Sequence, residues 1–285
     1  MTATIMAAGR AVAHAAGLIS DPFAEPLVRA AGVAFAARVV DGDPDLAELG
    51  DDGGFPRLAE LFATRTRLFD TFLVEAARAG VRQLVILASG LDTRGYRLWW
   101  PSGTTLYEVD QPRVLEFKTA TMRGWDVGPK LHRRAVIADL RRDWPTSLRR
   151  AGFDTSARTA WIAEGLLVGL LPPDAQDRLL DNVTRLSRRG SLLAADYPLP
   201  PTGPQRLNQR SLAQRWRRRA AGVDPAALIH PGERGDPARY LASHGWAVRK
   251  HDIADLFADA RLPALSARDL DGAPSSIGYL SATRE

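Results

Sequence analysis

Short apolar segments bounded by turn residues recur along most of this 285-residue chain, and they constrain its fold more than any other feature. Segments of helical length separate most of them, which predicts alternating strands and helices. This alternation favours a mainly parallel sheet covered by helices on both faces. The predicted strands are QLVILA (83–88), TLYEV (105–109), RAVIA (134–138), AWIAE (160–164), SLLAA (191–195), WAVRK (246–250) and GYLSA (278–282).

Two long segments lie outside this alternation. Residues 1–80 precede the first predicted strand, and we expect them to form an N-terminal helical cap. A Pro-rich and Arg-rich insertion at 198–235 follows the fifth strand. Ligands of open α/β sheets bind beyond the carboxyl ends of the strands, so this insertion is placed to act as a substrate lid. No repeat or low-complexity linker divides the chain, and we predict a single domain over 1–285.

One arginine before the first strand falls on the apolar face of a predicted helix. The stripe recurs at three- and four-residue spacing and consists of Leu58, Leu61, Phe62, Phe69, Phe72, Leu73 and Ala76. Arg65 lies in its middle, whereas Arg57 and Arg67 point elsewhere. A buried guanidinium needs a carboxylate, because burying an unpaired charge is costly. The partner is either an Asp or Glu of the chain or the carboxylate of a ligand.

The ends of the first two strands carry residues that suit a nucleoside ligand. Ser89 and Gly90 begin a small-residue turn, which either shapes the chain or lets a ligand approach the backbone. The turn lacks the GxGxxG spacing of dinucleotide-binding proteins, which disfavours NAD. Asp110, at the end of the second strand, is placed to accept hydrogen bonds from ribose hydroxyls. Its alternative role is to cap a helix beginning at Pro112.

The next two strands end in further candidate ligands. Asp139 and Leu140 close the third strand, where they suit an adenine amino group and ring. Glu164 closes the fourth and suits an ammonium or a sulfonium. Together with Arg65 for a carboxylate and Asp110 for a ribose, they describe an amino-acid nucleoside. The set selects S-adenosylmethionine over NAD, which has neither the carboxylate nor the α-amine.

Composition excludes several other classes of protein. The chain has no cysteine, which rules out disulfides, thiolate nucleophiles and Cys-ligated metals. Its histidines and carboxylates lack metal-ligand spacing, so we expect no metal. No segment reaches the roughly 20 apolar residues that span a bilayer, and we expect a cytoplasmic protein with no membrane contact. The sequence of residues 1–20 predicts a soluble helix. Nothing in the sequence indicates an oligomeric state.

The net charge of +5 comes almost wholly from arginine, and one arginine cluster stands out. It comprises Arg206, Arg210, Arg215, Arg217, Arg218 and Arg219. The cluster has three possible interpretations: a solvated helix face, a lid for an anionic substrate, or a patch that binds nucleic acid. Trp216 is its only aromatic residue, which disfavours nucleic acid.

Several stretches also carry a family resemblance. They are TRTRLFD (64–70), RQLVILASGLDTRGYRL (82–98), YEVDQPRVLEFK (107–118), ADLR (138–141) and WIAEGLLVGLLP (161–172), with SDPFAEPL (20–27) and GYLSATR (278–284) as weaker matches. In order and spacing they resemble the leucine carboxyl methyltransferase family, most closely its bacterial branch, which includes polyketide O-methyltransferases.

This resemblance implies a class I methyltransferase, which is a Rossmann-like α/β fold. Its sheet has seven strands, the last antiparallel, with extra N-terminal helices and a substrate lid. The family positions that line the S-adenosylmethionine pocket match Arg65, Gly90, Asp110, Asp139, Leu140 and Glu164, to which we add the neighbours Ser89 and Gln111. Gly169 stands where a bulkier residue is frequent, which either widens the acceptor pocket or loosens a helix start.

The expected reaction is O-methylation of a small molecule, at a carboxylate or a phenol of a polyketide-like natural product. A carboxylate is already ionised at neutral pH, whereas a phenol benefits from a general base. The catalytic candidates are Tyr197, otherwise a packing residue, and His230, otherwise an exposed loop residue. The arginine-rich lid favours an anionic acceptor. The alternatives are methylation of a protein C-terminal carboxylate, or a cofactor-binding protein with a cyclase or structural role.

Overall fold

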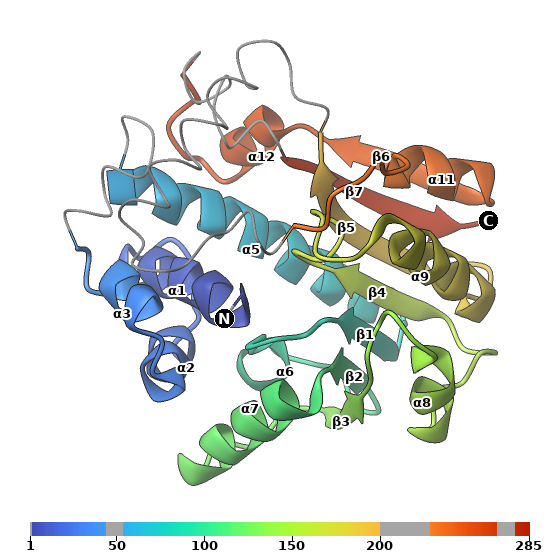
Figure 1. Cartoon of the computed structure of the whole chain (residues 1–285), viewed down its shortest axis with the longest axis horizontal. Helices are drawn as coiled ribbons and strands as arrows, with labels where there is room; N and C mark the ends of the chain where they lie inside the picture. The colour runs from blue at the N-terminus through green and yellow to red at the C-terminus, as the bar shows by residue number, and fades with distance from the viewer. Residues whose placement is uncertain (1, 44–53, 200–228, 267–276) are drawn as a thin grey trace.

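The computed structural model describes residues 2–43, 54–199, 229–266 and 277–285, and its centre is a single seven-stranded sheet (Figure 1). The strand order is β3-β2-β1-β4-β5-β7-β6. The strands are β1 (Gln83–Leu87), β2 (Thr105–Asp110), β3 (His132–Ile137), β4 (Thr159–Ala163), β5 (Leu192–Pro198), β6 (Trp246–His251) and β7 (Ile277–Arg284). All seven strands predicted from the apolar segments are therefore confirmed.

Strand direction follows the expected pattern. Strands β1 to β5 run parallel to one another. Strand β7 inserts between β5 and β6 and is antiparallel to both. Parallel strands need a crossover between them, and the intervening helices supply it. The predicted class I methyltransferase architecture, with its last strand antiparallel, is confirmed.

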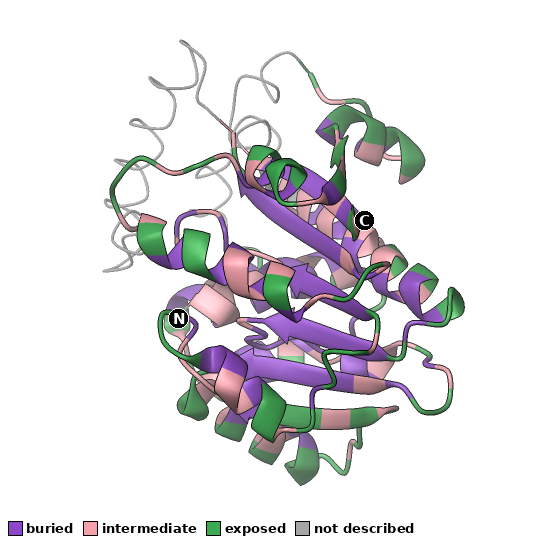
Figure 2. Ribbon diagram, turned by 90° about the vertical axis from the view of Figure 1, so that its right-hand side faces the viewer, coloured by how far each residue is buried: buried purple, intermediate pink, exposed green. Residues whose placement is uncertain are grey.

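Helices cover both faces of the sheet. The helices after the N-terminal region are α5 (Gly54–Arg78), α6 (Arg94–Arg97), α7 (Pro112–Gly124), α8 (Trp144–Arg150), α9 (Pro173–Leu186), α11 (Pro237–Ser243) and α12 (Ile253–Asp259). One face packs against α8, α9 and α11, and the other packs against α5. Strands β1 and β4 are buried along their whole length, and the outward sides of the helices are exposed (Figure 2).

Residues 2–43 form three helices, α1 (Thr2–Ala15), α2 (Ala24–Ala31) and α3 (Ala34–Val40), which lie together beside α5 (Figure 1). Their apolar residues form one cluster that includes Leu91, Tyr96 and Met122 from the α/β body. The helix predicted near the start of the chain is confirmed over Thr2–Ala15. Among the described residues no helix is long and apolar enough to cross a membrane.

All seven strands end one to three residues away from the ends of the predicted apolar runs, and two of these differences bear on the predicted site and lid. Strand β3 stops at Ile137, so Asp139 and Leu140 follow the strand rather than close it. Strand β5 continues through Pro198, three residues further than the apolar run, because it pairs with β7 along its full length. Most of the predicted lid at 198–235, including the cluster Arg206–Arg219, lies outside the described residues.

Candidate functional site

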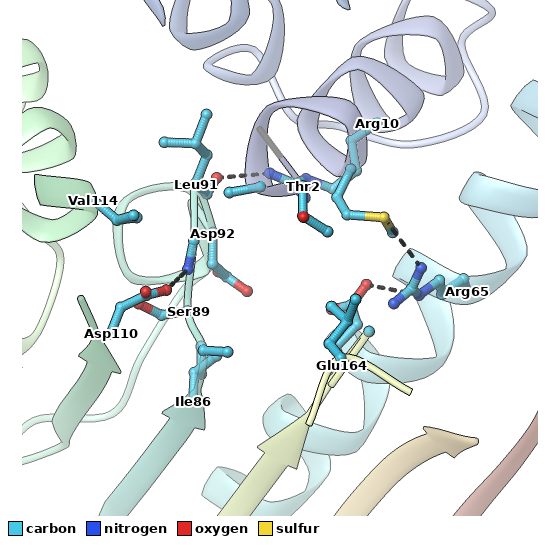
Figure 3. Close-up of a pocket in the computed structure, with 16 residues that line it drawn as sticks. Thr2, Arg10, Arg65, Ile86, Ser89, Leu91, Asp92, Asp110, Val114 and Glu164 are labelled. Carbon is cyan, nitrogen blue, oxygen red and sulfur yellow. Dashed lines mark hydrogen bonds and ion pairs between the residues drawn. The ribbon is translucent and has the colours of Figure 1, made fainter. Parts of the chain in front are cut away.

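A pocket of about 260 Å³ opens at the carboxyl ends of β1, β2 and β4, where ligands of open α/β sheets bind. The turn after β1 and Asp110 form one side, and Arg65 with Glu164 forms the opposite side (Figure 3). Helix α1 covers the pocket with Thr2, Met6 and other residues. Of the residues predicted to hold the cofactor, Arg65, Ser89, Gly90, Asp110 and Glu164 thus line one pocket.

The turn after β1 has an unusual backbone. Ala88 and Gly90 both have positive φ, of 51° and 50°. This region is unfavourable for a residue with a Cβ atom, and such strain gathers at functional sites. Between them lies Ser89, whose hydroxyl is buried and has no hydrogen-bond partner within the described chain. A ligand that entered the pocket would meet an unsatisfied polar group there.

Asp110 is held by backbone amides rather than serving as a helix cap. Its two carboxylate oxygens accept hydrogen bonds from the amides of Gly90 and Gln111, each at 2.6 Å. The N-cap position of α7 belongs to Gln111, so the helix-cap interpretation of Asp110 was wrong. Burial raises the pKa of Asp110, and the two amides and Lys118 partly offset that rise. Each oxygen keeps a free lone pair for a ligand hydroxyl.

Arg65 points inward, as the helical periodicity predicted. Its guanidinium forms ion pairs with Glu164 at 3.1 Å and Asp196 at 2.7 Å, and its side chain is 12% exposed. Burial alone lowers the pKa of Arg65, but Asp196 and Glu164 outweigh it and raise that pKa. The internal ion pair is therefore present, and Arg65 also lines the pocket. Its binding of a ligand carboxylate stays a prediction.

A second buried arginine, Arg94, also binds Glu164. Arg94, whose side chain is 2% exposed, forms ion pairs with Asp70 at 2.7 Å, Asp92 at 2.5 Å and Glu164 at 2.7 Å. Asp70 is in turn bound by Arg97. Glu164 is thus fixed between Arg65 and Arg94, which restricts its side chain to one orientation. Burial disfavours the charged form of Arg94, but its three carboxylates raise its pKa.

Several residues of this site were missed by the sequence analysis. Asp196 follows the apolar residues of β5 in the same way that Glu164 follows β4, so the strand-end rule applied to it equally. Arg94 lies in a four-residue helix with no readable periodicity. Arg10, which binds Asp21 and the carbonyl of Leu91, comes from α1, and its nearness to β1 depends on tertiary packing.

Three of the predicted cofactor residues lie outside the lining of this pocket. Gln111 is exposed and is fixed through its backbone amide. Asp139 binds Arg141 at 2.7 Å, which is the main cause of lowering its pKa to about 2. Leu140 packs into the core against α8. Their contact with adenine or ribose stays a prediction.

The two catalytic candidates also lie away from the pocket lining. Tyr197 is 3% exposed and packs on the α9 face of the sheet, whereas its neighbour Asp196 faces Arg65. His230 lies at the far end of the insertion, where its amide donates to the carbonyl of Gly169 at 2.9 Å. The catalytic roles of Tyr197 and His230 stay predictions.

Gly169 leaves space for a neighbouring segment of the chain. Its φ is 107°, and a Cβ atom there would lie 2.9 Å from Ile229. The missing side chain makes room for the returning end of the insertion, and Gly169 does not begin a helix, since α9 starts at Pro173. A wider acceptor pocket at Gly169 stays a prediction. Its neighbour Leu170 lines the pocket. The insertion therefore leaves the sheet at Pro198, two residues after Asp196, and returns beside Leu170.

Comparisons with known proteins agree with this geometry. The model of the leucine carboxyl methyltransferase family matches residues 3–184. A protein of Mycobacterium avium strain 104, described as an S-adenosyl-L-methionine-dependent methyltransferase, is 49% identical over 288 residues, covering 100% of this chain and 97% of the relative. A protein of Mycobacterium bovis BCG with the same description is 49% identical and covers 99% and 90%. The crystal structure of a DUF574-family protein from Streptomyces avermitilis shares the fold, with a TM-score of 0.50, 14% identity and 97% of each chain covered.

The sheet, its strand order and the pocket at its carboxyl edge define a class I methyltransferase that uses S-adenosylmethionine. The chain belongs to the leucine carboxyl methyltransferase family.

The charged and polar groups of the pocket suit this cofactor. Ser89 offers an unsatisfied hydroxyl and Asp110 a carboxylate on the side of the β1 turn, where an adenosine would lie. The ionic network consists of Arg10, Arg65, Arg94 and Arg97 with Asp21, Asp70, Asp92, Glu164 and Asp196. With all groups ionised, five carboxylates face four guanidiniums, which leaves one negative charge to attract a cofactor with one net positive charge.

The close contact between the β1 turn and α1 gives a test of how the pocket is closed. A Cβ atom on Gly90 would lie 2.9 Å from that of Ala3, whereas Gly17 has a similar φ of 71° and nothing within 4 Å. Both Gly90→Ala and Gly17→Ala impose left-handed strain of roughly 1–2 kcal/mol. We expect Gly90→Ala to lower the free energy of unfolding further and to weaken cofactor binding, as measured by denaturation and calorimetry. Equal effects of the two variants would show that the contact with Ala3 is unimportant.

Proposed function

We propose that this enzyme transfers a methyl group to an oxygen of a small molecule, most simply the carboxylate of a polyketide-like natural product. The observation that carries the proposal is the chemistry of the pocket lining. Among the described residues it contains no histidine, lysine or tyrosine, and its carboxylates Asp92, Asp110 and Glu164 are already bound by arginines or backbone amides, which disfavours them as general bases. A carboxylate acceptor needs none, because it is ionised at neutral pH.

In such a reaction the chain orients the cofactor and the acceptor, and it excludes water. When bound, S-adenosylmethionine would supply a methyl carbon on a positively charged sulfur, and the bond from this carbon to the acceptor oxygen would form in line as its bond to sulfur breaks and leaves a neutral thioether. We infer that Arg65 binds the carboxylate end of the cofactor and that Glu164 offsets its positive charge, because both residues line the pocket and Glu164 is held by Arg65 and Arg94. Helix α1 covers the pocket and keeps solvent from the reacting atoms.

The insertion after β5 is the proposed lid for the acceptor. Its first residues follow Asp196, which pairs with the pocket residue Arg65, and its last residues bind the loop that carries the pocket residue Leu170. Its arginine-rich sequence favours an anionic acceptor. We expect charge reversal at Arg217 to Arg219 to raise the Michaelis constant for an acidic acceptor and to leave that for a neutral phenol nearly unchanged.

The acceptor class is tested with cofactor carrying a labelled methyl group. The purified enzyme is incubated with a panel of small carboxylic acids, a panel of phenols, and a folded protein with a free C-terminal carboxylate. Mild alkali releases labelled methanol from a methyl ester but not from an aryl ether. Alkali-labile label on small acids supports the proposal. Label on the folded protein alone favours the protein methyltransferase, and tight cofactor binding without any turnover favours a cyclase or structural role.

A substitution at Asp110 tests how the pocket binds the adenosine part of the cofactor. Asp110→Asn keeps an acceptor for one backbone amide but removes the charge that favours ribose hydroxyls. Loss of a charged hydrogen bond is worth about 1.5–3 kcal/mol, so we expect cofactor affinity to fall roughly 10- to 150-fold in calorimetry. Asp143→Asn is the control, because Asp143 caps α8 away from the pocket. Unchanged affinity in Asp110→Asn would remove this residue from the site.

A further inference from the structure

A second pocket, of about 370 Å³, lies at the opposite edge of the sheet from the cofactor site. The amino ends of β1 and β2 contribute Gln83 and Thr105, and the turn before β4 contributes Arg158. Since β1, β2 and β4 run parallel, their amino ends meet at this edge and their carboxyl ends meet at the cofactor pocket. Pockets of this volume fall within the range of small-ligand sites.

Four arginines line this second pocket, namely Arg82, Arg134, Arg158 and Arg188. None of the lining residues that the structure describes is an aspartate or a glutamate. The nearby Asp154 carboxylate accepts hydrogen bonds from Ser156, and its charge also acts on Arg188. Within the described part of the chain Arg82, Arg134 and Arg158 form no ion pair with a carboxylate, in contrast to the arginines of the cofactor site.

The arginines are held in place by backbone carbonyls instead of by acids. Arg82 donates to Ala77 at 2.6 Å, Arg134 to Ala151 at 2.9 Å and Arg158 to Ala79 at 3.1 Å. A guanidinium has five N–H donors, so most donors of each side chain remain available. A Cβ atom on Gly190 would lie 3.0 Å from Cδ of Arg158, so the absence of a side chain there leaves the space that Arg158 occupies.

The four guanidiniums are exposed and carry the same charge, so salt and water weaken their mutual repulsion and a multivalent anion between them would reduce it further. Their planar forks match the oxygens of phosphate, and several of them match a ligand with more than one phosphate group. We propose that this pocket is a binding site for a small anion with two or more linked phosphates, separate from the methyltransferase site. Inorganic pyrophosphate and a nucleoside triphosphate share this chemistry.

The test is calorimetric titration of the full chain with pyrophosphate, tripolyphosphate and ATP, at about 0.15 M salt so that long-range attraction is screened. The first variant is Arg134→Gln with Arg158→Gln. The matched control is Arg123→Gln with Arg249→Gln, which removes the same charge from two exposed positions. Binding of S-adenosylmethionine is measured in each variant to show that the fold and the cofactor pocket are intact.

We expect at least one polyphosphate to bind, and its dissociation constant to rise tenfold or more in the first variant but less than twofold in the control. Tight binding of ATP alone would assign the site to a nucleotide, and equal binding of pyrophosphate would assign it to the phosphates themselves. An equal loss in the control, or no binding to the wild type, would overturn the proposal. If the double variant fails to fold, Arg82→Gln serves in its place with the same expected direction.

Discussion

Replacement of Arg65 with alanine is expected to abolish measurable cofactor binding and to lower the free energy of unfolding by about 3–5 kcal/mol. The variant leaves Asp196, which is 1% exposed, without its guanidinium and removes one of the two arginines that hold Glu164. A buried carboxylate without its partner carries an uncompensated desolvation cost. Calorimetry with S-adenosylmethionine and chemical denaturation measure the two effects.

Two further variants separate binding from stability. Arg78→Ala removes an arginine from the exposed last turn of the same helix, and we expect stability to change by less than about 0.5 kcal/mol. Arg65→Lys keeps a positive charge for Asp196 but lacks the planar fork, so we expect a folded protein that binds the cofactor weakly. Full cofactor affinity in Arg65→Lys would show that Arg65 acts only as an internal ion pair.

Replacement of Arg94 with methionine is expected to destabilise the protein by at least 3–5 kcal/mol. The change leaves three carboxylates facing one another in the interior. Asp70 keeps Arg97 and Glu164 keeps Arg65, so the largest penalty falls on Asp92. Arg29→Met is the matched control, because Arg29 also pairs with two carboxylates but is 49% exposed. We expect the control to cost less than about 1 kcal/mol. A similar loss of stability in the two variants would show that the burial of Arg94 is unimportant.

The cost of Arg94→Met is also expected to depend on pH. Burial alone raises the pKa of Asp92, but Arg94, Arg10 and Lys118 outweigh it, so this pKa lies below its ordinary value. The wild type therefore loses stability as the pH falls below about 4, where the unfolded carboxylate takes up a proton first. In the variant the pKa of Asp92 is raised, and protonation relieves the unpaired charge. The difference between the two proteins is thus expected to narrow on acidification in denaturation curves.

The sequence alone determined the strands and the parallel direction of most of them, because buried parallel strands need continuous apolar runs and the segments between them must be long enough to form helices. It also placed Gly90, Asp110 and Glu164 at one edge, since the carboxyl ends of parallel strands gather together. The inward direction of Arg65 followed from helical periodicity. All of these properties are local, and each can be read from spacing along the chain.

Only the tertiary structure decided which charges meet. Whether Arg65 serves the chain or a ligand depended on Asp196 and Glu164, which lie far from it in sequence. The same holds for Arg94 and for α1, which closes the pocket from the start of the chain. Ion pairs between distant segments have no periodic signature, because their energy depends on burial and distance rather than on sequence spacing. The periodic pattern therefore determined the sheet, and long-range packing decided the electrostatics of its site.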